Sequence, residues 1–240
     1  MASLILPKIS ETVNGFMKER EASHRFASFD YCYNHFHYSN PKRKRDLEKS
    51  CMALFSYLGS WGMLRGSGDL GQEKNIKCFV PMVEYIYRCK RSCWDIDVDN
   101  YEENMETILD IAETIQDYIE KGMDVSATAM LLTKVLFGVF GFVPAFDLQF
   151  QNTMFQVGTG KVNYFRDSSE SFNRNLFSKK LNWIGEIYAY KPNRRKIDAI
   201  YEAKDRFKTL VFQDGESIRY TRAKIIDMYG FYRNKSFAER

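Results

Sequence analysis

Apolar residues recur at three- and four-residue spacings along most of the chain, and this period predicts a mostly α-helical protein. The clearest case is the segment 105–119, after which Gly122 is placed to end the helix. Further helices are predicted at 4–38 (two segments with a break near 23–28), 47–58, 74–91, 171–190, 193–204 and 221–232.

The most apolar window is Leu131–Phe150. It predicts a buried central helix over residues 126–140, apolar on nearly every face, with Asp124 or Ser126 as its N-terminal cap. The other helices are expected to pack around this one.

Gly141 and Pro144 interrupt the apolar window. Proline is favoured at the first position of a helix, so Pro144 is expected to begin a second helix. Asp147 would then lie in the first turn, where the helix dipole favours a carboxylate.

Near the C-terminus, Lys208–Phe212 and Ser217–Tyr220 flank Asp214-Gly215 and predict a short β-hairpin near 208–220. The chain holds no internal repeat and no low-complexity linker. We therefore expect a single helical domain over residues 1–240, within which residues 1–92 could form an N-terminal helical subdomain.

Composition restricts the class of protein but does not indicate a particular function. Hydrophobic content of 45%, charged content of 28% and a net charge of +4 are typical of a globular protein and compatible with a polyanionic partner. The 19 Phe and 15 Tyr residues either build the core or form a surface for a protein partner or self-association. Five cysteines without a CxxC motif and the lack of a long apolar span predict a cytoplasmic protein with reduced thiols and no membrane segment.

Lys134 and Asp147 are the ionisable residues of the apolar window. Gly138 and Gly141 share a helix face with Lys134 and leave room beside its side chain. One interpretation is catalytic, with the lysine amine as nucleophile and the aspartate as activating carboxylate. The other is structural, with the glycines admitting a neighbouring helix, Lys134 reaching solvent and Asp147 capping its helix.

Two basic features could contact phosphate. Lys42, Arg43, Lys44 and Arg45 form the densest basic cluster, and Arg65 lies among three glycines whose backbone N–H groups could face an anion. The alternatives are a solvated loop and a glycine-rich turn at the end of a helix.

Acidic residues follow the segment 74–91. Asp95, Asp97, Asp99 and Glu106 have the spacing of a calcium-binding loop. The simpler interpretation is that Asp99 caps the next helix and Glu102 completes a capping box. We predict no metal and no cofactor, since the sequence has no nucleotide-binding glycine motif and no nucleophile elbow.

Several segments together resemble a family of bacterial proteins with no assigned function: Ser60–Ser67, Trp94–Asp97, Thr133–Lys134 with Gly138–Asp147, and Tyr220–Lys224. A second resemblance is local. Thr133–Val135 followed by Val143–Asp147 is similar to the end of the helix-hairpin-helix motif of DNA glycosylases. That motif's Leu-Pro-Gly-x-Gly hairpin is absent, and Lys121–Asp124 stands in its place.

The glycosylase resemblance implies a lysine nucleophile and an aspartate acting on the bond between base and sugar. We therefore expect a nucleic-acid-associated bacterial protein that acts on DNA or RNA through Lys134 and Asp147. A non-catalytic helical interaction module is the competing hypothesis. A small-molecule enzyme with its pocket around Trp61–Gly68 is a third.

Overall fold

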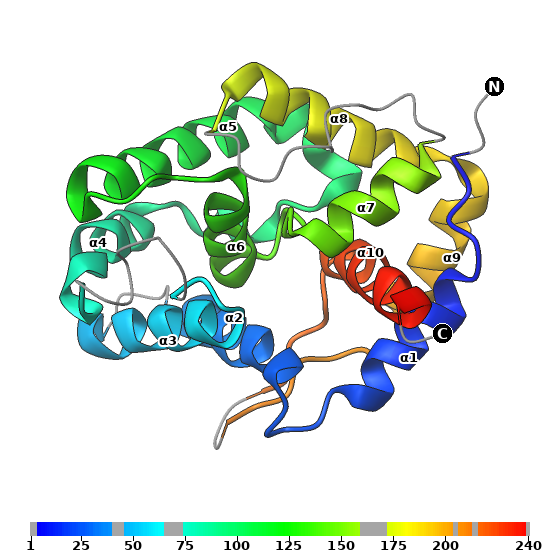
Figure 1. The fold of residues 1–240 in the computed structure, drawn as a ribbon, viewed down its shortest axis with the longest axis horizontal. Helices are drawn as coiled ribbons and strands as arrows, with labels where there is room; N and C mark the ends of the chain where they lie inside the picture. The colour runs from blue at the N-terminus through cyan, green and yellow to red at the C-terminus, as the bar shows by residue number, and fades with distance from the viewer. Residues whose placement is uncertain are drawn as a thin grey trace.

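A computed structural model describes residues 4–39, 46–64, 74–158, 172–203, 206–212 and 216–238. These residues form ten α-helices (Figure 1): α1 (Ile9–Glu19), α2 (Ser28–Ser39), α3 (Leu47–Ser60), α4 (Val80–Arg88), α5 (Tyr101–Asp117), α6 (Ala129–Phe140), α7 (Leu148–Val157), α8 (Arg174–Ala189), α9 (Lys191–Glu202) and α10 (Arg222–Ala238). The predicted all-α class is confirmed.

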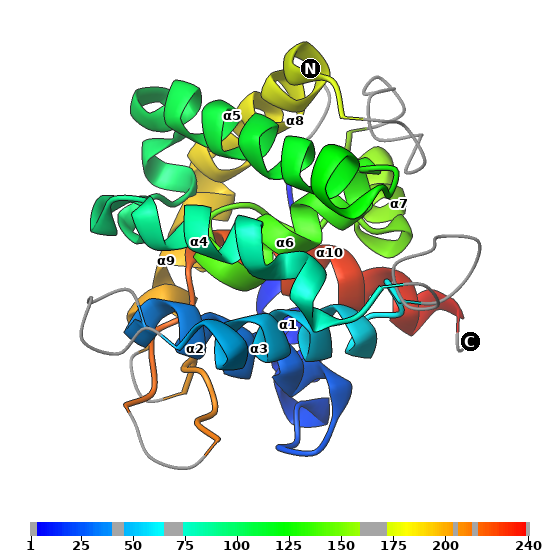
Figure 2. The same cartoon turned by 90° about the vertical axis from the view of Figure 1, so that its left-hand side faces the viewer.

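The helices lie in three tiers around α6. In Figure 2, α5 and α8 form the upper tier, α4, α6 and α10 the middle, and α1, α2 and α3 the lower. Helix α6 contacts α2, α3 and α5, while α10 packs on α1 and α7. Buried apolar side chains from Leu6 to Phe231 form one continuous core cluster.

The central helix is confirmed: its C-terminal end is where it was predicted, and its N-terminal end is corrected. Every residue from Leu131 to Phe140 is buried, as its apolar sequence requires. The N-terminal cap is Thr128, whose hydroxyl accepts from Leu131 N at 3.2 Å, so the prediction of Asp124 or Ser126 was wrong. At the other end Gly141 has φ 74°, a left-handed conformation that glycine adopts without strain.

The second helix begins later than predicted. Pro144 lies in an extended loop, and α7 starts at Leu148 with Asp147 as its N-cap. Hydrogen bonds to other elements hold this loop in place: Thr133 Oγ1 accepts from Phe146 N at 2.9 Å, and Asp227 accepts from Ala145 N at 3.1 Å. Asp147 Oδ1 accepts from Phe150 N at 2.9 Å, and this cap marks the observed start of α7.

The predicted β-hairpin is not seen. Within the described part of residues 206–220, Lys208 and Arg219 form a single antiparallel bridge and no strand is present. The expected turn, Asp214-Gly215, lies outside the described residues. Side chains of α2 bond the backbone of this segment instead: Asp30 accepts from Leu210 N at 2.9 Å, and Asn34 donates to Leu210 O at 2.8 Å.

In the acidic segment before α5, the capping residue lies two positions earlier than predicted. Asp97 and Asn100 make the capping box, so the proposed box from Asp99 and Glu102 was wrong. Asp97 also accepts from the backbone N–H groups of Arg222 and Ala223 at 2.7 and 2.9 Å, which caps α10.

Two of the other three acidic residues of the calcium-like spacing contact arginines: Asp99 pairs with Arg222, and Glu106 pairs with Arg174. The described residues contain no group of three or more His, Cys, Asp or Glu side chains arranged to hold a metal ion. No described helix is long and apolar enough to cross a membrane.

Candidate functional site

Lys134 and Asp147 meet in the interior. Lys134 Nζ donates to Asp147 Oδ2 at 2.9 Å, and the two residues are 3% and 9% exposed. Asp147 uses its other oxygen, Oδ1, to accept from Phe150 N at 2.9 Å as the cap of α7. One carboxylate therefore stabilises a helix end and neutralises a buried ammonium group.

A second ion pair lies within electrostatic reach of the first. Lys224 Nζ is 3.4 Å from Asp227 Oδ2 on α10, and both side chains are buried. Burial lowers the pKa of Lys224 and raises the pKa of Asp227, each partly offset by the other's charge. The charges of Lys134 and Asp147 also act on Asp227, so the two pairs form one buried electrostatic group.

Aromatic rings cover both ammonium groups. Lys134 Nζ lies 4.1 Å from the ring centre of Trp61, and Lys224 Nζ lies 4.3 Å from that of Phe29. These are cation–π distances, which help to compensate for the water that the buried ammonium groups lose.

One face of α3 covers α6. Tyr57 and Trp61 are four residues apart and so project from the same face. Tyr57 packs on Gly138, where an added Cβ would come within 2.4 Å of its ring. The sequence interpretation that Gly138 admits a neighbour is thus correct, and the neighbour is a tyrosine ring.

Three buried polar atoms around these contacts have no hydrogen-bond partner among the described residues: Tyr57 Oη, Trp61 Nε1 and Gln151 Oε1. Gln151 is one helical turn after Asp147 on α7. Burial raises the pKa of Tyr57 well above its usual range, and the charges of Asp227 and Asp147 add to this. Unpartnered buried polar atoms are uncommon in folded proteins, so a group of them is a feature to explain.

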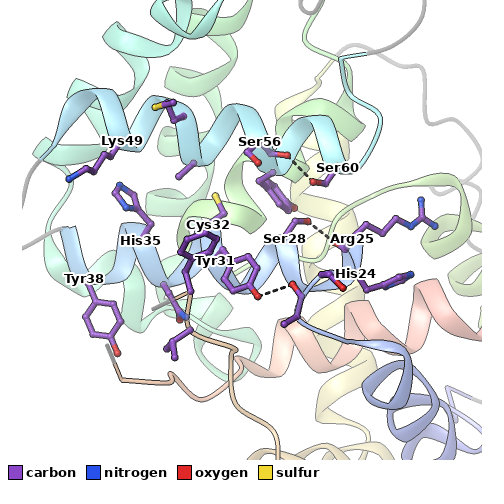
Figure 3. A pocket seen from close by; sticks show the side chains of 18 of the residues that line it. His24, Arg25, Ser28, Tyr31, Cys32, His35, Tyr38, Lys49, Ser56 and Ser60 are labelled. Atoms are coloured by element: carbon purple, nitrogen blue, oxygen red, sulfur yellow. Dashed lines mark hydrogen bonds between the residues drawn. The ribbon is translucent and has the colours of Figure 1, made fainter. Parts of the chain in front are cut away.

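An open pocket of about 1200 Å³ adjoins this region (Figure 3). Its walls are α2 and α3, its ends are formed near His24 and Arg25 on one side and Tyr38 and Lys49 on the other, and Val211 and Phe212 also line it. Tyr57 belongs to the lining, which connects the pocket to the covering face of α3.

The described lining of the pocket is weakly basic, with Arg25 and Lys49 against Asp46, its one acidic residue, and it also holds His24 and His35. Asp46 is already paired with Lys49 at 3.1 Å. Arg25 is exposed and forms no ion pair with a described residue, so its charge is available to a ligand.

Hydrogen bonds hold the histidine of the pocket wall in place. His35 Nε2 is 2.7 Å from Ser50 Oγ, which also bonds Tyr87 Oη, and Tyr87 donates to Asp46 O at 3.0 Å. Burial lowers the pKa of His35, so this wall is neutral near pH 7.

Exposed apolar side chains also gather at the pocket. Met52, Val211 and Phe212 line it, and Phe212 is 80% exposed. The Phe212 ring meets Tyr31 edge to face, with 5.5 Å between ring centres. An aromatic ring left in water beside a weakly basic pocket is a platform for a planar ligand group.

Sequence reasoning identified the Lys134–Asp147 pair and missed the rest of this region. The basic residues Lys42–Arg45 and Arg65 lie outside the described residues. Lys224 and Asp227 do not stand out in the same way, because the sequence of α10 also contains Arg222 and Arg233. The pocket could not be identified from sequence, because it joins residues 22–60 to Val211 and Phe212.

The comparisons with known proteins add no assignment to this geometry: no family model, no curated protein and no solved structure matches the chain.

Proposed function

We propose that the protein binds single-stranded nucleic acid, with a nucleotide unit seated in the pocket between α2 and α3. The observation that carries this proposal is the combination, in one open pocket, of an exposed aromatic ring and an arginine that has no ion pair within the described part of the chain. Proteins that bind single strands combine a basic groove for phosphates with aromatic side chains on which bases stack. Arg25 would contact phosphate, and Phe212 with Tyr31 would stack on a base.

Fluorescence anisotropy with labelled DNA and RNA strands of about 16 nucleotides tests this proposal. Affinity should fall steeply between about 50 and 200 mM salt, because phosphate contacts release counterions. Arg25→Gln should weaken binding and reduce the salt slope by about 1. Arg195→Gln removes the same charge from an exposed position on α9 and should change neither quantity.

Phe212→Ala should weaken binding by about 1–3 kcal/mol through lost stacking. Wild-type protein without affinity for either strand would overturn the proposal. If Phe212→Ala instead changed self-association in a salt-insensitive way, the pocket would serve a protein interface, as the competing hypothesis of an interaction module requires.

A second candidate function is glycosylase-like processing of a bound strand by Lys134 and Asp147. The observation behind it is that the two side chains lie together, 2.9 Å apart. In that reaction the lysine amine attacks the sugar carbon as the base leaves, so the ion pair must first open and the amine must lose its proton. Equal base release by wild type and Lys134→Ala would end this hypothesis.

A further inference from the structure

The turn after α4 brings two cysteine side chains together. Cys89 is the C-cap of α4, and its N–H donates to Tyr85 O at 3.2 Å. Cys93 follows four residues later in a short 3-10 helix, η4 (Arg91–Asp95), where its N–H donates to Lys90 O at 3.0 Å. The thiols of Cys89 and Cys93 hydrogen-bond each other across this turn. Three residues separate the cysteines, so the sequence shows no CxxC motif although the fold pairs them.

Contacts on both sides hold the paired cysteines in place. Trp94, the residue after Cys93, is buried, and its Nε1 donates to Val139 O on α6 at 2.9 Å. Cys89 Sγ lies 3.7 Å from Tyr85 O, within the last turn of α4. Two reactive groups held in contact react as if at high concentration, so the fold favours a bond between these sulfurs.

Solvent reaches the pair from one side. Lys90, Arg91 and Ser92, which lie between the two cysteines, are exposed, while Cys89 is half-buried and Cys93 is 6% exposed. A partly exposed site with adjacent basic residues is typical of reactive cysteines. Neither cysteine belongs to the described lining of the pocket between α2 and α3, so this is a separate site.

The two thiols differ in acidity. The hydrogen bond from Cys89 lowers the pKa of Cys93 to about 7 against the effect of burial, and a backbone hydrogen bond and the charge of Lys90 lower it further. The same hydrogen bond and burial raise the pKa of Cys89, which therefore keeps its proton. Burial also raises the pKa of the three other cysteines, Cys32, Cys51 and Cys78. A thiolate beside a protonated thiol is the arrangement of an attacking cysteine and its resolving partner.

We propose that Cys89 and Cys93 form a redox site that hydrogen peroxide oxidises to an intramolecular disulfide. In the first step the Cys93 thiolate attacks one peroxide oxygen and the O–O bond breaks, which gives the sulfenic acid of Cys93 and a hydroxide ion. In the second step Cys89 Sγ attacks Cys93 Sγ, the S–S bond forms and the S–O bond breaks. The departing hydroxide takes the proton of Cys89 and leaves as water. The two sulfurs together lose two electrons, and the peroxide gains them.

Peptide mass analysis of the whole protein tests this proposal. The folded chain is treated with an equimolar amount of hydrogen peroxide, unfolded in an alkylating reagent and digested with trypsin. Trypsin cleaves after Arg88, Lys90 and Arg91, so the dipeptide Cys89-Lys90 stays attached to the peptide 92–121 only through a disulfide. This linked product should form, and dithiothreitol added before alkylation should remove it.

Serine variants separate the roles of the two sulfurs. Cys89→Ser should stop the reaction at the sulfenic acid of Cys93, which dimedone traps, because serine can donate the hydrogen bond but cannot form the disulfide. Cys93→Ser should give neither the linked product nor a sulfenic acid at Cys89. The matched control is Cys78→Ser, which removes another half-buried thiol and should leave the yield of linked product unchanged. In wild type at pH 7, Cys93 should be oxidised about fivefold faster than Cys78, since its larger thiolate fraction outweighs its lower nucleophilicity.

Three results would overturn the proposal: separate Cys89 and Cys93 peptides after peroxide treatment, disulfide-linked dimers in place of the intramolecular product, or oxidation of Cys78 as fast as Cys93. If either serine variant fails to fold, the wild type still decides the matter. Its rate of linked-product formation should rise with pH through about 7, as the Cys93 thiolate forms, and a rate independent of pH would contradict the mechanism. None of these results depends on strand binding, so the two proposals stand or fall separately.

Discussion

At the scale of single residues, the buried ion pairs place the strongest constraints on substitution. Lys134→Met should destabilise the protein by about 3–5 kcal/mol, because it leaves the buried Asp147 carboxylate without its cation. Urea unfolding measures this loss.

The double variant Lys134→Met/Asp147→Asn is the matched control. The asparagine oxygen can still accept from Phe150 N and cap α7, so most of the lost stability should return. A loss below about 1 kcal/mol in the single variant would show that water reaches Asp147 in the native state.

His37 is a second residue with a sharp expectation. Burial and the neighbouring Arg91, whose guanidinium is 2.6 Å from Nε2, lower the pKa of His37 from 6.5 to about 4. Between these values the unfolded chain binds a proton that the folded chain does not. The stability contributed by His37 therefore rises with pH through this interval.

Asp97 has the opposite effect on the pH dependence of stability, since burial raises its pKa to about 6. The difference between wild type and His37→Gln isolates the histidine, because glutamine can still accept from Arg91. The difference in urea midpoint between wild type and His37→Gln should increase as the pH rises from about 4 to 6.5. A constant difference over that range would contradict the assignment.

At the scale of elements, the contact between α3 and α6 is set by a glycine. Gly138→Ala should destabilise by about 1–3 kcal/mol, because its Cβ would meet the Tyr57 ring in a packed interior. Gly185→Ala on α8 is the control, with no atom within 4 Å of the new Cβ, and should stabilise by about 0.5–1 kcal/mol. Thermal unfolding of both variants measures the contrast, and equal shifts would contradict the packing.

Helices were predictable from sequence because their signal is local. The three- and four-residue apolar spacing identified α3, α5 and α6, and Gly141 marked the end of α6. Caps were less predictable, since Asp124, Ser126 and Thr128 all lie within reach of the same helix end and tertiary context decides among them. The hairpin prediction failed for the same reason, since Asp30 on α2 accepts from the backbone N–H of Leu210.

The candidate site was also predictable from sequence only in part. Charges within an apolar helix stand out in sequence, which is why Lys134 was identified. That its partner was Asp147 followed from the short loop between them. The pocket and the ring contacts of Trp61 depend on Phe26, Phe212 and Phe231, which are positioned only by the tertiary fold.

At the scale of the whole molecule, Asp30 joins the two ends of the chain. The fully buried carboxylate accepts from Arg20 at 2.8 Å, Tyr220 at 2.8 Å and Leu210 N at 2.9 Å. Asp30→Ala should cost about 3–5 kcal/mol and speed hydrogen exchange of the Leu210 amide.

The matched control for Asp30→Ala is Asp110→Ala. It removes a carboxylate from the exposed cluster around Arg174 and should cost about 0–1 kcal/mol. Similar losses of stability in the two variants would show that Asp30 does not hold the two ends of the chain together.

The cap that Asp97 provides for α10 also orders events during synthesis. Asp97 and Arg222 are 125 positions apart, so the carboxylate is made long before the amides that solvate it in the fold. A nascent chain lacking α10 holds Asp97 near apolar segments without the Arg222 and Ala223 amides that bond it in the fold. The segment before α5 therefore completes its contacts only when the last helix is made, and until then the unfinished chain is a substrate for chaperones and proteases.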